Sequence, residues 1–384
     1  MNKREFIRKG LIGLGASISG LYALKTFGRD ISSKSTFQIS PSPSNKLDKW
    51  SIEARYYSQT ARGVKCRLCP TICNLKENET GECRTRINIE GKLYCIAYGN
   101  PCAVHIDPIE KKPLYHFLPS STAFSIATAG CNLACLNCQN WEISQRSPNE
   151  TRNYDMMPEK VVEECKKNQC QSIAYTYSEP IAFYEYTYDT SVLAKKEGIK
   201  NVLISAGYIN EEPLRELCKV IDAANIDLKS FDNKVYEMLN AGTLEPVLNT
   251  LKILHEENIW FEITNLIVPE WTDNLDMIKK MCDWLVENGL RDYPLHFSRF
   301  HPTYKLKQLP MTPSVTLEKA RQIALDSGIK FVYIGNVPET HADCTICNKC
   351  GKTIVERRGF TIISNNIIDA SCKFCGEKIP GVWK

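Results

Sequence analysis

The chain has 384 residues, of which 43% are hydrophobic and 24% are charged, as is usual for a soluble globular protein. Its formal net charge of +4 is small for this length, so we expect no nucleic-acid partner. Cysteine is the exception, with 18 residues, and most of them stand in tight C-x2-C or C-x3-C clusters. This spacing is typical of metal or iron–sulfur ligation by thiolates in a reducing compartment, and it disfavours a disulfide framework.

Residues 1–30 combine a basic start with an uncharged, Gly-rich run from Gly10 to Leu24. The string KREFIR at positions 3–8 resembles a twin-arginine export signal in which Lys replaces the first Arg. A loose amphipathic tail or a weak membrane anchor is the alternative, because the apolar run is short for a membrane span. The chemistry expected below draws on cytoplasmic cofactors, so the sequence leaves the compartment open. Residues 31–49 are rich in Ser, Pro, Asn and Lys and are expected to form a flexible linker.

Residues 50–120 form a predicted N-terminal Cys-rich module. Its four main cysteines follow the pattern Cys66-x2-Cys69-x3-Cys73-x9-Cys83. This spacing is looser than that of a zinc ribbon and does not match the ferredoxin run C-x2-C-x2-C-x3-C-P. Zinc and an auxiliary iron–sulfur cluster therefore both remain open at this site.

Residues 121–335 alternate short apolar runs with longer amphipathic stretches. The expected strands are Phe124–Thr128, Ile173–Tyr177, Val202–Ser205, Asn225–Leu228, Phe261–Ile267, Leu295–Ser298 and Phe331–Ile334. The expected helices are Pro158–Lys167, Ala182–Glu197, Glu212–Val220, Pro246–Glu257, Leu275–Glu287 and Ser314–Asp326. Regular alternation predicts an α/β domain with a parallel sheet, and about six repeats favour a partial, TIM-like (β/α)6 barrel.

Residues 336–384 form a third module with paired knuckles. Cys347-x2-Cys350 and Cys372-x2-Cys375 are separated by 21 residues. Two such knuckles around a β-rich insert are typical of a zinc ribbon, although four thiolates also suit rubredoxin-type iron. Cys344 is a spare or competing ligand. We expect a structural role for this module.

The most informative segment follows the first predicted strand of the barrel. It reads AGCNLACLNC and places Cys131, Cys135 and Cys138 in a C-x3-C-x2-C loop. Three thiolates can hold three irons of a [4Fe–4S] cluster, and no fourth Cys lies nearby in the loop. The fourth iron is then open to a chelating ligand, and S-adenosylmethionine (SAM) can chelate it through its amino and carboxylate groups. Three of four zinc ligands, or buried thiols, are the alternatives.

Longer strings around this loop carry a resemblance to a known family. GCNLACLNCQNWEISQ, with IDPIEKKPLYHFLP ahead of it, resembles radical SAM enzymes of the AmmeMemoRadiSam system, which are similar to the pyruvate formate-lyase activating enzyme. The resemblance continues through AYTYSEP, NIDLKSFDNKVYEML, SRFHPTYKL, YIGNVPE and ERRGF, roughly from Cys66 to Trp383. One departure is Asn137, which stands where the family usually has an aromatic residue before the third Cys.

The predicted strand ends supply further candidates for binding SAM. The resemblance implies that Glu179 holds the SAM ammonium, and that Asp227 and Lys229 lie at its methionine end or near the substrate. An internal ion pair is an equal alternative for Lys229. By position, Ser205 is a candidate for the SAM ribose, and Asn265 ends the fifth strand. Two more residues, Arg299 and His301, share a face after the sixth strand, where Arg suits a carboxylate or phosphate and His is otherwise structural.

These features together predict a radical SAM enzyme, with a [4Fe–4S] cluster, SAM and zinc as cofactors. The expected reaction is reductive cleavage of SAM, followed by hydrogen abstraction from an unidentified substrate. Resemblance to activating enzymes suggests a protein or peptide substrate, and an electron donor such as flavodoxin or ferredoxin. Resemblance to the AmmeMemoRadiSam group implies a Memo-like protein as partner or substrate. The alternative function is an iron–sulfur and zinc protein for electron transfer or redox sensing that does not process SAM.

Overall fold

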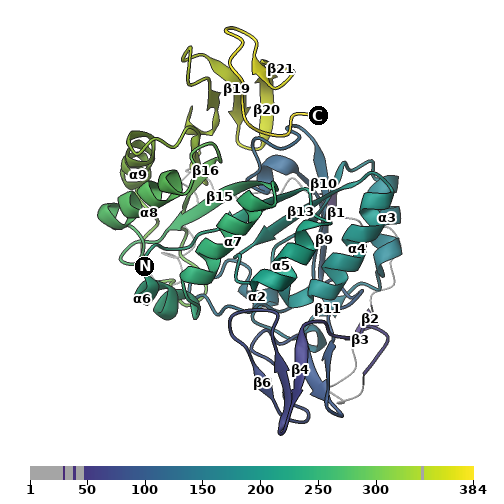
Figure 1. Cartoon of the computed structure of the whole chain (residues 1–384). Helices are drawn as coiled ribbons and strands as arrows, with labels where there is room; N and C mark the ends of the chain where they lie inside the picture. The colour runs from purple at the N-terminus through teal and green to yellow at the C-terminus, as the bar shows by residue number, and fades with distance from the viewer. Residues whose placement is uncertain (1–28, 31–37, 40–46, 339–340) are drawn as a thin grey trace, which may run out of the picture.

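The structure is a computed structural model that describes residues 29–30, 38–39, 47–338 and 341–384 (Figure 1). The predicted export signal and most of the predicted linker lie outside these residues. Among the helices that the structure describes, none combines the length and apolar character that crossing a membrane requires.

A nine-stranded mixed sheet forms the centre of the molecule. Its strand order is β1-β9-β10-β12-β13-β14-β15-β16-β17. Seven consecutive strands of this sheet are parallel, and they are β10 (Thr122–Ala127), β12 (Ser172–Tyr175), β13 (Lys200–Ser205), β14 (Ala223–Asp227), β15 (Trp260–Ile267), β16 (Leu295–Arg299) and β17 (Val332–Gly335). Their residues are buried almost throughout, as expected for parallel strands covered on both faces.

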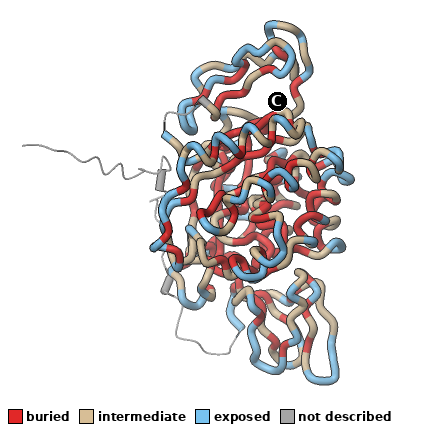
Figure 2. Tube along the Cα trace, turned by 90° about the vertical axis from the view of Figure 1, so that its left-hand side faces the viewer, coloured by how far each residue is buried: buried red, intermediate tan, exposed pale blue. Residues whose placement is uncertain are grey.

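Helices connect the parallel strands. They are α3 (Pro158–Lys167), α4 (Tyr184–Lys196), α5 (Glu211–Cys218), α7 (Glu245–Glu256), α8 (Leu275–Glu287) and α9 (Ser314–Asp326). Figure 1 shows α4, α5 and α7 in front of the sheet, and Figure 2 shows buried residues concentrated in this central layer. Two short segments between β14 and α7 break the regular pattern: α6 (Asn233–Val235) and the π-helical turn η4 (Tyr236–Asn240).

The sheet extends beyond its parallel strands on one side. β9 (Ala103–Pro108) pairs antiparallel with β10, and β1 (Arg29–Asp30) pairs with β9. Residues 103–108 therefore belong to the central sheet, although the sequence analysis assigned them to the N-terminal module. Only the three-residue 3-10 segment Ile109–Lys111 follows this strand, in place of a longer helix, so the sequence shows no strand–helix alternation there.

Small antiparallel sheets make up the N-terminal module. One contains β4 (Tyr57–Thr60), β5 (Gly63–Cys66) and β6 (Asn74–Leu75), and the other contains β3 (Ile52–Glu53), β8 (Lys92–Cys95) and β7 (Arg86–Ile89). Figure 1 shows this module at the bottom of the molecule, next to the short helix α2 (Trp141–Ser144) that follows the cysteine loop. The module therefore lies at the carboxyl ends of the parallel strands.

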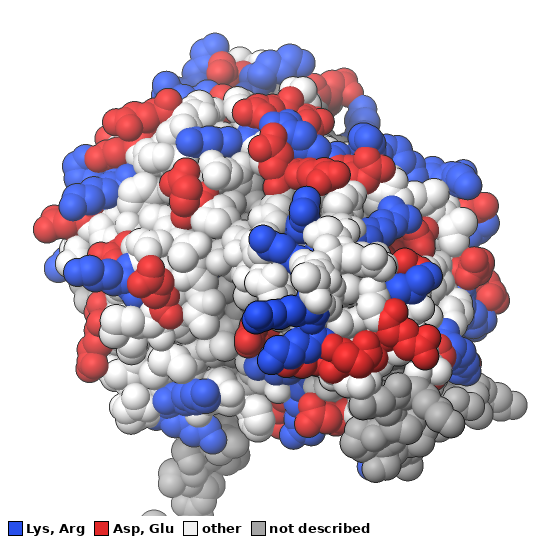
Figure 3. All heavy atoms as spheres, turned by 60° about the horizontal axis from the view of Figure 1, so that its bottom comes forward, with Lys and Arg blue, Asp and Glu red and all other residues white. Residues whose placement is uncertain are grey.

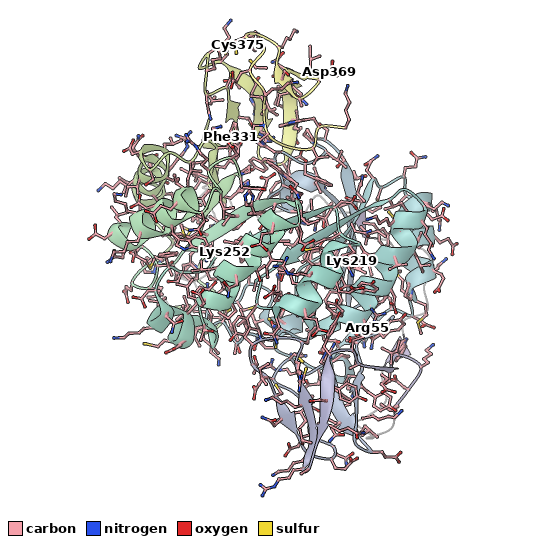
Figure 4. All side chains as sticks on the ribbon, viewed as in Figure 1. Arg55, Lys219, Lys252, Phe331, Asp369 and Cys375 are labelled. Carbon is pink, nitrogen blue, oxygen red and sulfur yellow. The ribbon has the colours of Figure 1, made fainter. Side chains whose placement is uncertain are left out.

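The C-terminal module lies at the opposite end of the sheet. Its strands are β18 (Thr345–Ile346), β19 (Thr353–Arg358), β20 (Thr361–Asn365), β21 (Ile367–Ile368) and β22 (Ser371–Cys372). Arg357 fixes the module to the central domain, because its guanidinium donates to the backbone oxygen of Tyr115 at 2.7 Å. Figure 4 shows Phe331, the residue before β17, at this junction and Cys375 at the far end of the module.

Candidate active site

The Cys131–Cys138 loop lies at the carboxyl end of β10 and packs against the N-terminal module. Gly130 starts the loop with φ +102°, a conformation that favours glycine. A Cβ at Gly130 would lie 2.4 Å from Thr85 Cγ2 and 2.6 Å from the carbonyl oxygen of Cys83. Both its backbone conformation and its close contact therefore require glycine at this position.

The π-helical turn η4 holds the loop from the other side. Ala134 N donates to Asn240 O at 3.0 Å, and Leu136 N donates to Leu239 O at 2.9 Å. The Asn240 side chain donates to the Cys135 sulfur at 3.2 Å. A donor of this kind stabilises a thiolate ligand and tunes the metal centre that it binds. The sequence analysis missed Asn240, because a π-turn leaves no recognisable periodicity.

The three loop cysteines are not packed as closely as the ligands of a single metal ion. Cys135 is buried, and Cys131 and Cys138 are half-buried. Among the described residues, the only group of three or more potential ligand atoms lying within 4.8 Å of one another is in the C-terminal module. Sulfurs that bind separate corners of a [4Fe–4S] cube stand roughly 6 Å apart, so a loop without such compact packing is compatible with a cluster.

Glu179 is buried at the end of β12 and connects two strand ends. One carboxylate oxygen accepts from Ser205 Oγ at 2.7 Å and from Ile181 N at 3.1 Å. The other oxygen accepts from Ala206 N at 2.8 Å. Burial raises the pKa of Glu179 above its usual value, although these hydrogen bonds and Lys229 oppose the shift. Ser205, which was predicted to contact the SAM ribose, thus donates a hydrogen bond to Glu179, which was predicted to bind the SAM ammonium.

Asp227 and Lys229 form an ion pair of 2.9 Å at the end of β14. Burial alone would lower the pKa of Lys229, but the negative charges of Asp227 and Cys135 raise it well above its usual value. The internal ion pair that the sequence analysis gave as an alternative is therefore present. It also places a cation near Cys138, where its charge opposes the rise that burial causes in the pKa of that thiol.

The remaining candidates lie farther along the sheet. Asn265 is buried and donates to Leu228 O at 2.7 Å, but β15 continues to Ile267, so Asn265 does not end that strand. Arg299 ends β16 and donates to Ser314 Oγ. His301 lies beyond the strand and is exposed. The structure therefore places Arg299 in a partly buried network, whereas His301 lies in contact with solvent.

Several buried polar atoms on the cysteine loop, η4, β15 and β16 have no hydrogen-bond partner within the part of the chain that the structure describes. They are Asn132 Oδ1, Asn137 Oδ1, Asn240 Oδ1, Asn265 Oδ1 and Arg299 Nε. Buried polar groups are normally satisfied, so these atoms are free to bond to a ligand or to ordered water. With the thiols and Glu179, these atoms offer the sulfur, carboxylate and amide contacts that a cluster and an amino-acid ligand need. The residues present thus fit a [4Fe–4S] cluster and SAM.

The C-terminal cysteines form a compact four-thiol site. All four sulfurs of Cys347, Cys350, Cys372 and Cys375 lie within 4.8 Å of one another. The sulfur distance is 3.6 Å between Cys347 and Cys375, and 3.8 Å between Cys350 and Cys372. A tetrahedral ion with metal–sulfur bonds of about 2.3 Å needs sulfurs about 3.8 Å apart. Cys344 stays outside the group, since its sulfur contacts Asp343 and the backbone of Arg357.

Comparison with known proteins identifies the family of the chain. The Radical SAM superfamily model matches residues 125–285, a range that begins inside β10 and includes the whole cysteine loop. An uncharacterized protein of Methanocaldococcus jannaschii, MJ0808, is 47% identical over 330 residues, which are 85% of this chain and 98% of that protein. The chain belongs to the radical SAM superfamily.

More distant similarities connect this radical SAM chain with activating enzymes. The pyruvate formate-lyase 1-activating enzyme of Escherichia coli is 24% identical over 220 residues, or 53% of this chain and 89% of that enzyme. A solved domain of the pyruvate-formate lyase-activating enzyme from Bacteroides vulgatus aligns with a TM-score of 0.39 and 18% identity. The alignment covers 43% of this chain and 99% of that domain. The sequence and family-model matches confirm the predicted radical SAM membership, which implies SAM binding, but they do not show the AmmeMemoRadiSam group.

Proposed function

We propose that this radical SAM chain cleaves SAM reductively and uses the product to abstract hydrogen from a protein or peptide substrate. In this proposal Cys131, Cys135 and Cys138 hold the cluster in a partial barrel formed by the parallel strands. When bound, the cluster and SAM supply one-electron cleavage of the S–C5′ bond, giving methionine and a 5′-deoxyadenosyl radical. The electron comes from a reduced flavodoxin or ferredoxin.

The observation that carries the proposal is the anchoring of the cysteine loop beside Glu179 and Lys229. η4 fixes the loop through Asn240, and Lys229 adds a positive charge among the thiols. Glu179 joins two adjacent strand ends and offers a buried carboxylate to an ammonium group. These residues bind and orient, and the buried surroundings exclude water. The chain matches activating enzymes by homology, which supports a macromolecular substrate.

Product analysis tests this function. Anaerobically purified protein, reduced with dithionite, should convert SAM to 5′-deoxyadenosine and methionine in equal amounts. Cys135→Ala should abolish both products, whereas Cys218→Ala, on the distant helix α5, should leave them unchanged. An electron-transfer or redox-sensing protein that does not process SAM would give no 5′-deoxyadenosine above the level of the Cys135→Ala variant.

The substrate itself is sought with labelled partners. Deuterium transfer from a labelled candidate into 5′-deoxyadenosine would identify the atom that loses hydrogen. The association with a Memo-like protein stays a prediction, and a Memo-like protein is the first candidate for this assay.

In the C-terminal module we propose zinc, since the thiol distances equal those of a tetrahedral zinc site.

A further inference from the structure

The four cysteines of the N-terminal module line one small cavity. Cys66, Cys69, Cys73 and Cys83 line a cavity of about 20 Å³ that is partly open to solvent. Apart from these thiols, its wall is mostly apolar, with Leu68, Leu75 and Ile181 among the contributors. Four thiols that line one small, mostly apolar cavity are typical of an iron–sulfur or metal site.

We propose that Cys66, Cys69, Cys73 and Cys83 hold a second [4Fe–4S] cluster, directly beside the loop that binds the first. Neither the family assignment nor SAM cleavage is needed for this inference. It rests on the spacing of the sulfurs, on the cavity between them and on the contacts that link the two sites.

The spacing of the sulfurs distinguishes a cluster from zinc. The C-terminal module gives the sulfur distances of a site for one metal ion in this chain, since two pairs of its cysteine sulfurs lie 3.6 and 3.8 Å apart. No three sulfurs of the N-terminal set reach the 4.8 Å limit within the described residues. A cluster needs a separation of roughly 6 Å, because each thiolate binds a different iron of the cube. The sulfurs of the N-terminal set are thus not packed as closely as those of the C-terminal module, which favours a cube over one ion.

Glycine keeps the space between two of the ligands free. A Cβ at Gly81 would lie 3.6 Å from the Cys73 sulfur and 3.8 Å from the Cys83 sulfur. Gly81 therefore faces the point between these two sulfurs, and any side chain there would enter the cavity. The backbone around it is fixed, since Gly81 N donates to Arg86 O and Arg84 N donates to Gly81 O, both at 2.8 Å.

A buried cation compensates the negative charge of such a cluster. Arg86 lines the cavity with only 2% of its surface exposed. Its guanidinium pairs with Glu185 at 2.5 Å and donates to Arg55 O at 3.0 Å, but its Nε has no partner within the described residues. A buried cation with an N–H group that has no other partner can donate a hydrogen bond to the thiolates or sulfides of a cluster and so stabilise them.

The two sites share a wall. Asn132, the residue after Cys131, lines the N-terminal cavity, and so do Ile181 and Ala182, which follow Glu179. Arg84, the residue after Cys83, donates to Cys131 O at 3.4 Å and to Gln145 Oε1 at 3.2 Å. With four protein ligands, the second cluster has no open iron and cannot bind SAM. Its position instead suits a one-electron carrier beside the first cluster.

Iron counting in a variant that lacks the first cluster tests the proposal without any measurement of activity. The full chain carrying Cys131→Ala, Cys135→Ala and Cys138→Ala is purified anaerobically. It should retain about four irons and four sulfides, and one zinc in the C-terminal module. After reduction it should give the EPR signal of a [4Fe–4S]⁺ cluster, and this signal should not change when SAM is added.

Adding Cys69→Ser and Cys73→Ser to that variant should remove all iron but keep the one zinc, which also shows that the chain folds. Cys102→Ser is the matched control, because Cys102 does not line the cavity, and it should keep the four irons. Two zincs and no iron in the variant without the first cluster would overturn the proposal, and so would a metal-free N-terminal site in a folded chain. Failure of SAM cleavage alone would instead contradict the proposed function.

Discussion

At the scale of single residues, Glu179 is the acid that we propose to hold the SAM ammonium. Glu179→Gln keeps the shape of the side chain and removes its charge, so we expect SAM to bind 10- to 100-fold more weakly. This range corresponds to about 1.5–3 kcal/mol, which is typical of a hydrogen bond to a charged group. Equilibrium binding to the protein with its cluster measures the change, and the absorbance near 400 nm should stay unchanged.

Glu163→Gln is the matched control for Glu179→Gln. The Glu163 side chain is 64% exposed on α3, where it pairs with Lys160. SAM affinity should not change in this variant. Equal affinities for the Glu179→Gln protein and the parent would exclude Glu179 from the SAM site.

Gly130 tests the contact between the cysteine loop and the N-terminal module. Gly130→Ala adds a Cβ 2.4 Å from Thr85 Cγ2 at a positive φ, whereas Gly91→Ala adds one at φ +72° with nothing within 4 Å. Both substitutions place an alanine at a positive φ, but only Gly130→Ala also brings the new Cβ into steric conflict with neighbouring atoms. We expect it to lower the free energy of unfolding by about 1–3 kcal/mol more than Gly91→Ala does. Equal unfolding midpoints in urea would contradict the close packing.

At the scale of elements, the metal site should control the order of the C-terminal strands. Cys350→Ala removes one of four thiolates, so the module should lose the single zinc that we propose for it. Hydrogen exchange in β19 and β20 should then become faster, because structural zinc contributes folding energy directly. The parallel strands β12–β14 lie at a distance and should exchange as before. Retention of one zinc per chain in this variant would contradict the assignment of the ligands.

His116 connects the central sheet to the C-terminal module as a neutral imidazole. Its Nδ1 donates to Pro380 O at 2.7 Å, and its Nε2 accepts from Tyr333 Oη at 2.6 Å. Burial lowers the pKa of His116 to about 4, against the opposing effect of Glu262, while Arg357 and His296 add to the lowering. The unfolded chain therefore takes up a proton at a higher pH than the folded chain does.

This pKa shift predicts how stability depends on pH. The contribution of neutral His116 is fully present above about pH 6.5, and it is lost as the pH falls toward 4. The loss amounts to about 3 kcal/mol. Urea unfolding between pH 4 and 7 measures this loss. Over that range the free energy of unfolding of His116→Gln should fall by about 3 kcal/mol less than that of the parent protein. Parallel profiles for the two proteins would contradict a neutral, buried His116.

At the scale of the whole molecule, the regular part of the fold could be predicted from sequence. The pattern predicts helices Pro158–Lys167 and Leu275–Glu287, and α3 and α8 have these bounds. Both have one apolar face, and Pro158 starts the first of them, so local signals agree with the tertiary structure. The antiparallel strand β9 and the turn η4 were missed, because neither has a periodicity that repeats along the chain.

The candidate site shows the same limit of sequence reasoning. The loop cysteines are recognisable because their spacing along the chain reflects the chemistry that they serve. Asn240 and Arg84 reach the site from segments about 100 and 50 residues away, so only tertiary contacts reveal them. The proximity of the two cysteine sites likewise depends on how the N-terminal module packs on the sheet.

The central claim is that SAM binds the open iron of the cluster held by Cys131, Cys135 and Cys138. Electron–nuclear double resonance on the reduced protein tests it directly with SAM labelled with ¹⁵N at its amino group. We predict a hyperfine coupling to this nitrogen, which disappears in the Cys135→Ala variant. A well-formed four-iron cluster that shows no coupling to labelled SAM would contradict the account.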